Sequence, residues 1–409
     1  MTRLDLSPLE RHPAPGSAAL RPALEQVWSV LPDARLVGGV VRDLIAGSAI
    51  ADLDLATPDP PEVVLERLAA ARIHTVATGL SHGTVTALSH GHPIEITTLR
   101  RDQETDGRHA VVAWTQDWRE DAERRDFTIN AMSLARDLTL FDYFGGADDL
   151  RAGRVRFVGE AASRIAEDAL RMLRFFRFEA RYGLGTPDPA ATAAIEAALP
   201  ALDGLSGERV WSELRRILAG PALARTVALM RGLGLLGRLL PGAVRDARLS
   251  RLLDTGLPSD PVLRLAVLIE GPPAPVVQAL RLSNAEGARL EALGLPPAPR
   301  PDMDAAGLRR LLAEHPPELL CGRAWLAQGD GAAEDAQAWN TLRRRLAETP
   351  RPSFPLAGRD VLADGVAAGP EVGRLLAGTR DWWLAGGCVA DRDGCLEHLR
   401  HQRHEAPAI

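Results

Sequence analysis

The chain of 409 residues is long enough for about two to four domains, and its composition is that of a folded globular protein. Hydrophobic residues make up 46% and charged residues 25%, so long disordered stretches are not expected. No apolar run reaches the ~18 residues that a membrane-spanning helix needs, and the N-terminus lacks the apolar stretch of a signal peptide. Three cysteines, an odd number without CxxC spacing, fit a reducing cytosol and argue against structural zinc. We therefore expect a cytoplasmic protein without membrane contact.

The charge balance is mildly acidic, with a formal net charge of −6, and gives no global signal for nucleic-acid binding. All 48 basic residues are arginine, because the sequence contains no lysine. Every contact of this chain with a phosphate or a base through a cation must therefore use a planar guanidinium, which has several donors in a fixed arrangement.

The first part of the chain, from Leu36 to Phe144, is rich in short β-branched or alternating runs separated by Gly and Pro. A run at 53–57 follows a Gly/Ser loop. Two further runs flank His90-Gly91-His92-Pro93, and another two flank Arg136-Asp137. We therefore expect several strands, including two hairpins at these turns.

After Gly145-Gly146 the pattern becomes helical and stays so almost to the end. The stretch Ser163–Tyr182 has helical periodicity, and Gly207–Leu218 is predicted to form an amphipathic helix. The Pro-rich segment at 296–301 is a candidate linker. The predicted fold class is α+β, with a mixed head followed by an all-α remainder.

Two carboxylates in one strand are the first chemical signal. Asp52 and Asp54 stand two residues apart, so both project from one sheet face while Leu53 and Leu55 face the core. Two like charges held this close call for a cation, and Mg²⁺ with oxygen ligands fits them. Just upstream, Gly38-Gly39 has no side chains to keep phosphates away from backbone N–H groups.

These residues occur in the order GGxVRD…DxD, and the chain resembles the class II tRNA nucleotidyltransferase (CCA-adding enzyme)/poly(A) polymerase family of polymerase-β-like nucleotidyltransferases. Further motifs in family order support the resemblance. They are Asp121-x-x-Arg124-Arg125-Asp126-Phe127-Thr128-x-Asn130, Asp142-Tyr143-Phe144-Gly145-Gly146-x-x-Asp149, Glu167-Asp168-x-x-Arg171-x-x-Arg174-x-x-Arg177, Glu208-Arg209-x-x-x-Glu213, and Gly358-Arg359-Asp360 in the tail.

The resemblance implies a polymerase-β-like head, a mixed sheet flanked by helices, followed by an all-α neck, body and tail. The expected boundaries are a lead-in at 1–20, a catalytic head at 21–147, a neck with the nucleotide-selecting helices at 148–220, a helical body at 221–300 and a tRNA-binding tail at 301–409.

The neck motif predicts how bases are selected. Cytosine and adenine both present an exocyclic amine donor beside a ring-nitrogen acceptor, whereas guanine and uracil present the inverse order. A carboxylate beside a guanidinium complements the first pair and repels the second. Asp168 and Arg171 form such an edge, and the resemblance implies the same assignment, with Glu167 orienting Arg171. The alternative is a solvated face on which the acids pair with Arg171 along the helix.

The remaining site residues are assigned largely through the resemblance. Nucleotide binding is expected from Gly38, Gly39, Arg42, Arg125, Asp126, Asn130, Arg174 and Arg177, with Asp52 and Asp54 as catalytic metal ligands. Glu95 is expected as a third catalytic carboxylate that binds the attacking hydroxyl or removes its proton; a surface strand glutamate is the alternative.

The expected function is addition of CMP and AMP from CTP and ATP to tRNA 3′ ends, with Mg²⁺ as cofactor and no obligate protein partner. The resemblance favours full CCA addition, because CC-only relatives are shortened in a loop that is long here, Arg100–Asp121, and contains Asp106-Gly107-Arg108. A poly(A) polymerase or an A-only-adding enzyme is the first alternative, although a pI near 6.0 disfavours a general RNA binder. A catalytically inactive RNA-binding homologue is the second.

Overall fold

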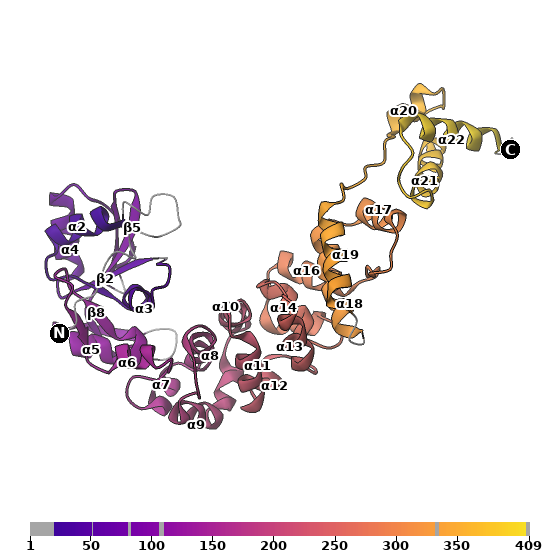
Figure 1. Ribbon diagram of the computed structural model, residues 1–409. Coiled ribbons are helices and arrows are strands. Elements are labelled where there is room, and N and C mark those ends of the chain that lie inside the picture. Colours follow the sequence, from indigo (N-terminus) through magenta and orange to yellow (C-terminus); the bar gives the residue numbers. More distant parts are fainter. Residues whose placement is uncertain (1–19, 51, 81–82, 106–109, 332–334, 406–409) are drawn as a thin grey trace. The chain divides into compact units, whose positions relative to one another are not determined.

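The computed structural model describes residues 20–50, 52–80, 83–105, 110–331 and 335–405 (Figure 1). The contacts divide the chain into two compact units, one ending at Leu239 and the other beginning at Leu240. The predicted lead-in at 1–20 and the predicted loop residues Asp106-Gly107-Arg108 lie, except for Leu20, outside the described residues.

The first unit contains a seven-stranded mixed sheet in the order β3-β4-β5-β2-β1-β8-β9. Its strands are β1 (Arg35–Val37), β2 (Leu53–Thr57), β3 (His74–Gly79), β4 (Thr84–Ser89), β5 (His92–Thr98), β8 (Met132–Leu134) and β9 (Leu140–Asp142). Neighbouring strands pair antiparallel except β2 and β5, which run parallel. This mixed sheet confirms the predicted fold class of the head.

Both predicted hairpins are present. Strands β4 and β5 are joined through His90 and Gly91, whose φ angles are 48° and 81°. Positive φ at both central residues gives the twist that a two-residue hairpin turn needs. Strands β8 and β9 form the second hairpin around Arg136-Asp137. A separate two-stranded sheet, β6 (Arg100–Thr105) with β7 (Ala110–Trp114), occupies part of the predicted loop 100–121.

Helices cover the sheet because their apolar faces need burial. Helices α2 (Leu20–Val30) and α4 (Pro61–Ala70) pack against β3, β4 and β5, whereas α3 (Gly39–Ile45) packs against β1 and β8. The short 3₁₀ helix η3 (Thr128–Asn130) and helices α5 (Trp118–Glu123) and α6 (Gly146–Arg151) complete the head.

From α6 onward the described residues form helices and loops, with only isolated bridges between extended residues, as predicted. The rest of the first unit contains α7 (Ala161–Glu167), α8 (Leu170–Tyr182), α9 (Pro189–Ala197), η4 (Leu199–Gly204), α10 (Gly207–Leu218), α11 (Leu223–Gly232) and α12 (Leu235–Leu239). Helix α10 has the predicted bounds.

The prediction that Ser163–Tyr182 forms a single helix is wrong. Asp168 adopts an extended conformation, with φ −154° and ψ 107°, and separates α7 from α8. The apolar residues of both helices continue the same periodicity, so the pattern alone does not reveal the break. The arginines at 171, 174, 177 and 181 still lie on one helix, α8.

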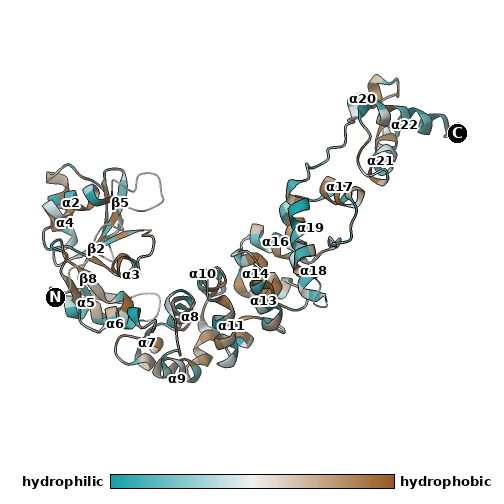
Figure 2. Ribbon diagram, in the orientation of Figure 1, coloured by the Kyte–Doolittle hydropathy of each residue, from teal (hydrophilic) through white to brown (hydrophobic). Residues whose placement is uncertain are grey.

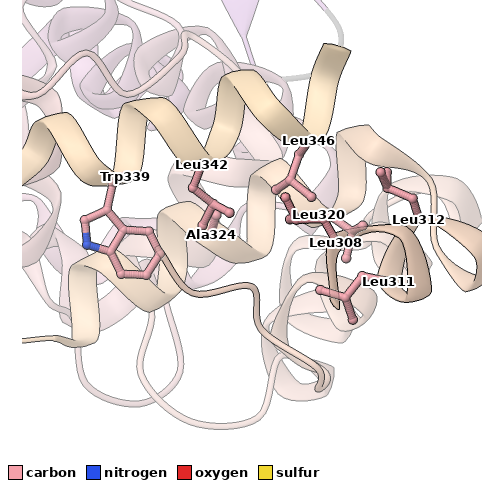
Figure 3. Packing of buried hydrophobic residues seen from close by; sticks show 8 residues of the cluster. All are labelled: Leu308, Leu311, Leu312, Leu320, Ala324, Trp339, Leu342 and Leu346. Carbon is pink, nitrogen blue, oxygen red and sulfur yellow. The ribbon is translucent and has the colours of Figure 1, made fainter. Parts of the chain in front are cut away.

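The second unit contains helices α13 (Asp246–Asp254), α14 (Pro261–Leu268), α15 (Ala274–Leu280), α16 (Asn284–Gly294), α17 (Ala305–Glu314), α18 (Pro317–Asp330), α19 (Ala336–Glu348), α20 (Gly358–Ala363), α21 (Pro370–Ala385) and α22 (Arg392–Glu405). Leucines of α17, α18 and α19 pack with Trp339 in one apolar cluster (Figure 3). A second cluster, around Val361, Leu375 and Leu399, joins α20, α21 and α22. The ribbon of α22 has mainly the colour of hydrophilic residues (Figure 2). None of the described helices is long and apolar enough to cross a membrane.

The start of α6 contacts η3 so closely that only glycine fits. A Cβ added to Gly146 would lie 2.1 Å from the carbonyl oxygen of Thr128. The same junction is tied by Thr128, which donates to Asp149 on α6 over 2.7 Å. Helix α6 therefore fixes the position of η3, which carries Asn130.

We expect Gly146→Ala to destabilise the first unit by about 1–3 kcal/mol, because the extra methyl group must displace backbone rather than a flexible side chain. Gly232→Ala on α11 is the matched control, since a Cβ there meets nothing within 4 Å. Scanning calorimetry of both variants checks this. A melting temperature of Gly146→Ala equal to that of the control would contradict the packing described.

Candidate active site

The two predicted metal carboxylates lie at the start of β2. Leu53 and Leu55 are 3% and 1% exposed, so the intervening Asp54 points to the opposite face, as the alternation predicts. Asp52 immediately precedes the strand and is exposed. Glu95 on β5 is the direct parallel partner of Asp54. The topology therefore brings Asp54 and Glu95 to paired positions of two strands, with Asp52 just before the first of them.

Their mutual effect is visible in the ionisation of Asp54. Burial, and then the charges of Glu95 and Asp52, raise the pKa of Asp54 to about 6, against an opposing effect of Arg125. Carboxylate oxygens are the donors that hard divalent cations prefer, and a cation would relieve this repulsion. The donor chemistry thus fits a divalent metal. Among the described residues, no three His, Cys, Asp or Glu side chains form a complete metal-binding group, so further ligands would be water or phosphate oxygens.

Next to these carboxylates lies a cavity of about 600 Å³ between the head and helices α8 and α10. Its volume is that of a typical ligand pocket. The lining residues are Gly38, Gly39, Arg42, Asp54, Arg124, Arg125, Asp126, Asn130, Asp168, Leu170, Arg171, Arg174, Arg177, Phe178, Arg209 and Arg216. All the predicted nucleotide-binding residues except Glu167 are therefore brought together. Asp52 and Glu95 are not among the described residues that line the cavity.

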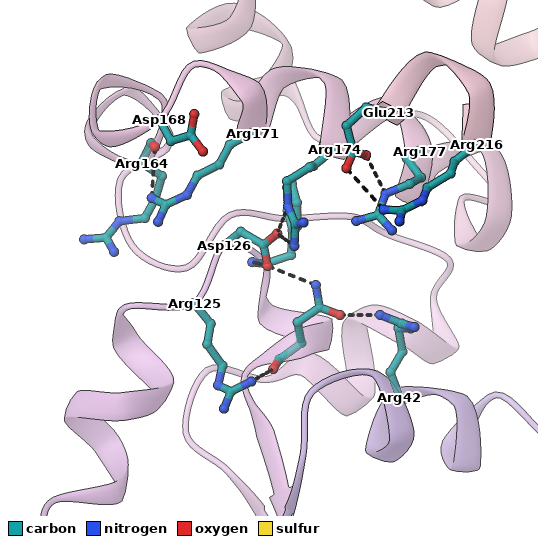
Figure 4. A network of polar contacts seen from close by, with 12 residues as sticks. Arg42, Arg125, Asp126, Arg164, Asp168, Arg171, Arg174, Arg177, Glu213 and Arg216 are labelled. Atoms are coloured by element: carbon teal, nitrogen blue, oxygen red, sulfur yellow. Dashed lines mark hydrogen bonds and ion pairs between the residues drawn. The ribbon is translucent and has the colours of Figure 1, made fainter. Parts of the chain in front are cut away.

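The α7–α8 break positions the predicted base-selecting residues (Figure 4). Asp168 accepts a hydrogen bond from the backbone N–H of Leu170 over 3.0 Å and one from Arg209 on α10 over 2.8 Å. Arg171 is held by an ion pair with Glu167 and donates to the carbonyl oxygen of Arg164. Of the alternative, in which both Glu167 and Asp168 pair with Arg171, the structure contains only the Glu167 ion pair, and Asp168 pairs with Arg209 instead. Glu167 contacts Arg171 as expected, and its role in selection stays a prediction.

A second group of contacts joins the head to α8. Arg42 donates to the side-chain oxygen of Asn130 over 2.5 Å, and Asn130 donates to Asp126 over 2.9 Å. Arg174 reaches the other oxygen of Asp126 over 2.5 Å. The charge of Arg174, together with hydrogen bonds, lowers the pKa of the Asp126 carboxyl despite its burial. Asp126 is therefore ionised at neutral pH.

Two buried acids hold the remaining cations. Asp121, which is 2% exposed, binds both Arg124 and Arg125 over 2.7 and 3.0 Å, and their charges lower its pKa despite burial. Glu213 on α10 binds Arg177 over 2.7 Å and Arg216 over 3.5 Å. Burial lowers the pKa of Arg177 to about 10, so this guanidinium stays charged at neutral pH.

Gly38 has a specific geometric role beside Arg125. Its φ is 67°, in the left-handed region, and a Cβ added there would lie 3.0 Å from Nη1 of Arg125. The absent side chain therefore lets this guanidinium lie against the backbone at the start of α3.

Sequence reasoning missed five lining residues: Arg124, Leu170, Phe178, Arg209 and Arg216. Arg124 and Arg209 stood within recognised motifs but received no role. Arg216 lies one and two helical turns from Glu213 and Arg209 on α10, so helical spacing was the available signal. The partner of Asp168 could not be identified from local spacing, because Arg209 is 41 residues away.

We expect the repulsion at Asp54 to be measurable as a pH-dependent stability. A raised carboxyl pKa means that the folded state holds its proton more tightly, so stability falls as the pH rises from about 4 to 6. Glu95→Gln should therefore raise the melting temperature in metal-free buffer at pH 7.5 by roughly 1–3 °C. The gain should vanish at pH 5, where Asp54 is already protonated. Glu66→Gln, at an exposed position of α4, is the control. An equal effect of Glu95→Gln at both pH values would contradict the coupling.

Parts of the chain match two family models. Residues 34–156 match the poly A polymerase head domain, and residues 186–246 match the probable RNA and SrmB-binding site of polymerase A. The chain is 35% identical to human mitochondrial CCA tRNA nucleotidyltransferase 1 over 90% of its own length and 86% of that protein. It is 32% identical to the CCA-adding enzyme of Geobacillus kaustophilus, over 87% of the chain and 92% of the relative.

A solved structure gives the same result for the fold. The Bacillus stearothermophilus CCA-adding enzyme in complex with CTP superimposes with a TM-score of 0.73 at 29% identity, covering 94% of this chain and all of that one. The chain is therefore a nucleotidyltransferase that belongs to the class II tRNA nucleotidyltransferase/poly(A) polymerase family.

Proposed function

We propose that the chain is a template-independent CCA-adding enzyme that transfers CMP and AMP from CTP and ATP to the 3′ end of tRNA and releases pyrophosphate. One observation carries this proposal. A single cavity combines a carboxylate and a guanidinium suited to a base edge, Asp168 and Arg171, with a group of arginines and with Asp54. The relatives named as CCA tRNA nucleotidyltransferases support the same substrates.

The base would bind at the start of α8. The Asp168 carboxylate offers about four acceptor positions, and its contacts with Leu170 and Arg209 use two of them. It can therefore accept from the exocyclic amine of cytosine or adenine, while Arg171 donates to the adjacent ring nitrogen. Glu167 positions Arg171 through the ion pair between their side chains. Uracil and guanine would place a carbonyl oxygen against the carboxylate, which disfavours them.

The triphosphate would lie toward the head. Gly38 and Gly39 leave the backbone accessible, and Arg42 and Arg125 flank them in the cavity wall. Arg174 and Arg177 on α8 add positive charge from the opposite side. Asp126 and Asn130 would contact the ribose, since both line the cavity between these groups.

Asp52 and Asp54 would hold Mg²⁺, and Glu95 would bind the attacking 3′-hydroxyl or take its proton. Enzymes of this family use divalent metal ions, and the choice of Mg²⁺ is part of the proposal. When bound, Mg²⁺ supplies Lewis-acid activation of the hydroxyl and neutralises charge on the leaving group. The 3′-oxygen then forms a bond to the α-phosphorus as the bond to pyrophosphate breaks.

Three finer expectations also remain proposals. The division into head, neck, body and tail at residues 147, 220 and 300 is one of them, and the tRNA-binding role of the tail is another. A cytoplasmic location is the third, and three vertebrate relatives are named as mitochondrial proteins.

The reaction is tested with tRNA transcripts that end at the discriminator base, at C or at CC, each incubated with one nucleotide and Mg²⁺. CTP should add two residues to the first transcript and one to the second, and ATP should add a single residue to the CC end. UTP and GTP should be poor substrates. Long A tails would identify a poly(A) polymerase, and A addition without C addition would identify an A-only enzyme.

Asp52→Ala and Asp54→Ala should each abolish incorporation of both nucleotides. Activity within about tenfold of wild type, roughly 1.4 kcal/mol of barrier, would remove them from the reaction centre.

We expect Asp168→Ala to change base choice as well as rate. The substitution removes the hydrogen bond to the amine and the repulsion of a carbonyl, so use of CTP and ATP should fall while discrimination against UTP and GTP shrinks by about 5- to 150-fold. The measurement is kcat/KM for four nucleotides on one primer. Asp203→Ala, at an exposed acid that pairs with Arg238, is the control. An equal loss for every nucleotide would make Asp168 a structural partner of Arg209 only.

A further inference from the structure

Six side chains form a chain of hydrogen bonds whose two ends both lie on α8, so the backbone of this helix closes the chain into a ring. In order, the ring consists of Arg174, Asp126, Asn130, Arg42, Asp43 and Tyr182. Arg174 and Tyr182 both belong to α8 and lie about two helical turns apart. The other four belong to the head, so the ring fastens α8 to the head at two separate points.

The closing contact is made by Tyr182, whose hydroxyl donates to Asp43 on α3, 139 residues earlier in the chain. Asp43 also accepts from Nε of Arg42 over 3.1 Å and from Nη2 over 3.2 Å. Tyr182, Asp43 and Arg42 are 8%, 7% and 8% exposed. Hydrogen bonds at buried positions are costly to leave unmade, so each ring member constrains its neighbours.

The aromatic ring of Tyr182 also makes packing contacts that a phenylalanine at this position would preserve. The Arg42 guanidinium lies 4.8 Å from the centre of the Tyr182 ring and 5.1 Å from that of Phe178. The rings of Phe178 and Tyr182 are stacked at 6.2 Å. Burial raises the pKa of Tyr182 to about 12, so its hydroxyl remains a donor at any pH used in an assay.

The ring members differ in their relation to the cavity. Arg42, Asn130, Asp126 and Arg174 line it, whereas Asp43 and Tyr182 are outside its described lining. These two residues were not among the predicted site residues either. Their contact nonetheless determines whether the ring is closed.

We propose that Tyr182, acting through Asp43, is a positioning residue that sets the distance between the base-reading end of α8 and the reaction centre in the head. This inference rests on the proposed function, because it requires one nucleotide to contact both parts. In the proposed function the base is bound by Asp168 and the start of α8, whereas Gly38, Gly39, Arg42, Arg125 and Asp54 belong to the head. A nucleotide held correctly at its base reaches the carboxylates only if α8 keeps its register against α3.

Tyr182→Phe tests the proposal, because it removes one hydroxyl group and keeps the packing. We expect kcat for CTP and ATP to fall by roughly 5- to 20-fold with KM changed by less than about threefold, since alignment rather than affinity is lost. The ratio of kcat/KM for CTP to that for UTP should also shrink by a similar factor, because a looser α8 admits misplaced bases. Tyr143→Phe is the matched control, since the chain has only two tyrosines.

The ratio for CTP and UTP is decisive, because a lower fraction of folded enzyme leaves it unchanged. An unchanged ratio in Tyr182→Phe would overturn the proposal, whatever happens to kcat. Amide hydrogen exchange adds a readout that does not depend on the substrates: exchange in α8 should quicken in Tyr182→Phe and not in Tyr143→Phe. Unaltered exchange would likewise overturn it. If wild type itself fails to use CTP and ATP, the proposed function fails, and hydrogen exchange alone then decides whether the ring fixes α8.

Discussion

The pairing of guanidinium groups with buried or half-buried carboxylates is the interaction on which the site depends. Among the described residues, eight arginines line one cavity, and at close range their charges repel one another. Each of the eight forms an ion pair with a nearby acid. The acids are Asp43, Asp121, Asp126, Glu167, Asp168 and Glu213. These ion pairs hold the eight guanidinium groups in fixed positions in the cavity wall.

These acids come from elements that the fold brings together from distant parts of the chain. Helix α5 supplies Asp121, the segment before η3 supplies Asp126, and α10 supplies Glu213. The carboxylates that we propose for the reaction centre come instead from the sheet, where Asp54 and Glu95 occupy paired positions of β2 and β5. Burial and then the charge of Glu95 raise the pKa of Asp54, which is the opposite of the effect that the ion pairs have on the pKa of Asp121 and Asp126. The arginines of the cavity wall are thus each paired with an acid, whereas Asp54 lies near the like charges of Glu95 and Asp52, which Arg125 offsets only in part.

Much of this arrangement was predictable, because it follows from local pattern. The two hairpins follow from turn chemistry and alternation, and Asp54 faces away from the core because Leu53 and Leu55 face into it. The motifs also predicted most of the cavity lining. The break at Asp168 was not predictable, since the apolar periodicity continues through it and only a backbone conformation marks it.

The hydrogen-bond partners of the site residues could not be predicted from the sequence either. Asp168 with Arg209 and Asp43 with Tyr182 join residues 41 and 139 positions apart. Hydrophobic periodicity specifies which face of a helix is buried, but it does not specify which polar residue of another helix meets it. Such pairs are determined by tertiary packing. The sequence pattern therefore does not predict the contacts that hold Asp168 and Asp43 in place.

The central claim is that one cavity reads the base on α8 and holds the phosphates against the head. It is tested most directly by a crystal structure with a CTP analogue in which a methylene group replaces the oxygen between the α- and β-phosphorus atoms. The account predicts the cytosine amine within about 2.7–3.2 Å of Asp168, the ring nitrogen at Arg171, and the phosphates beside Arg42, Arg125 and Asp54. A cytosine bound elsewhere, with Asp168 contacting only Arg209 and Leu170, would contradict it.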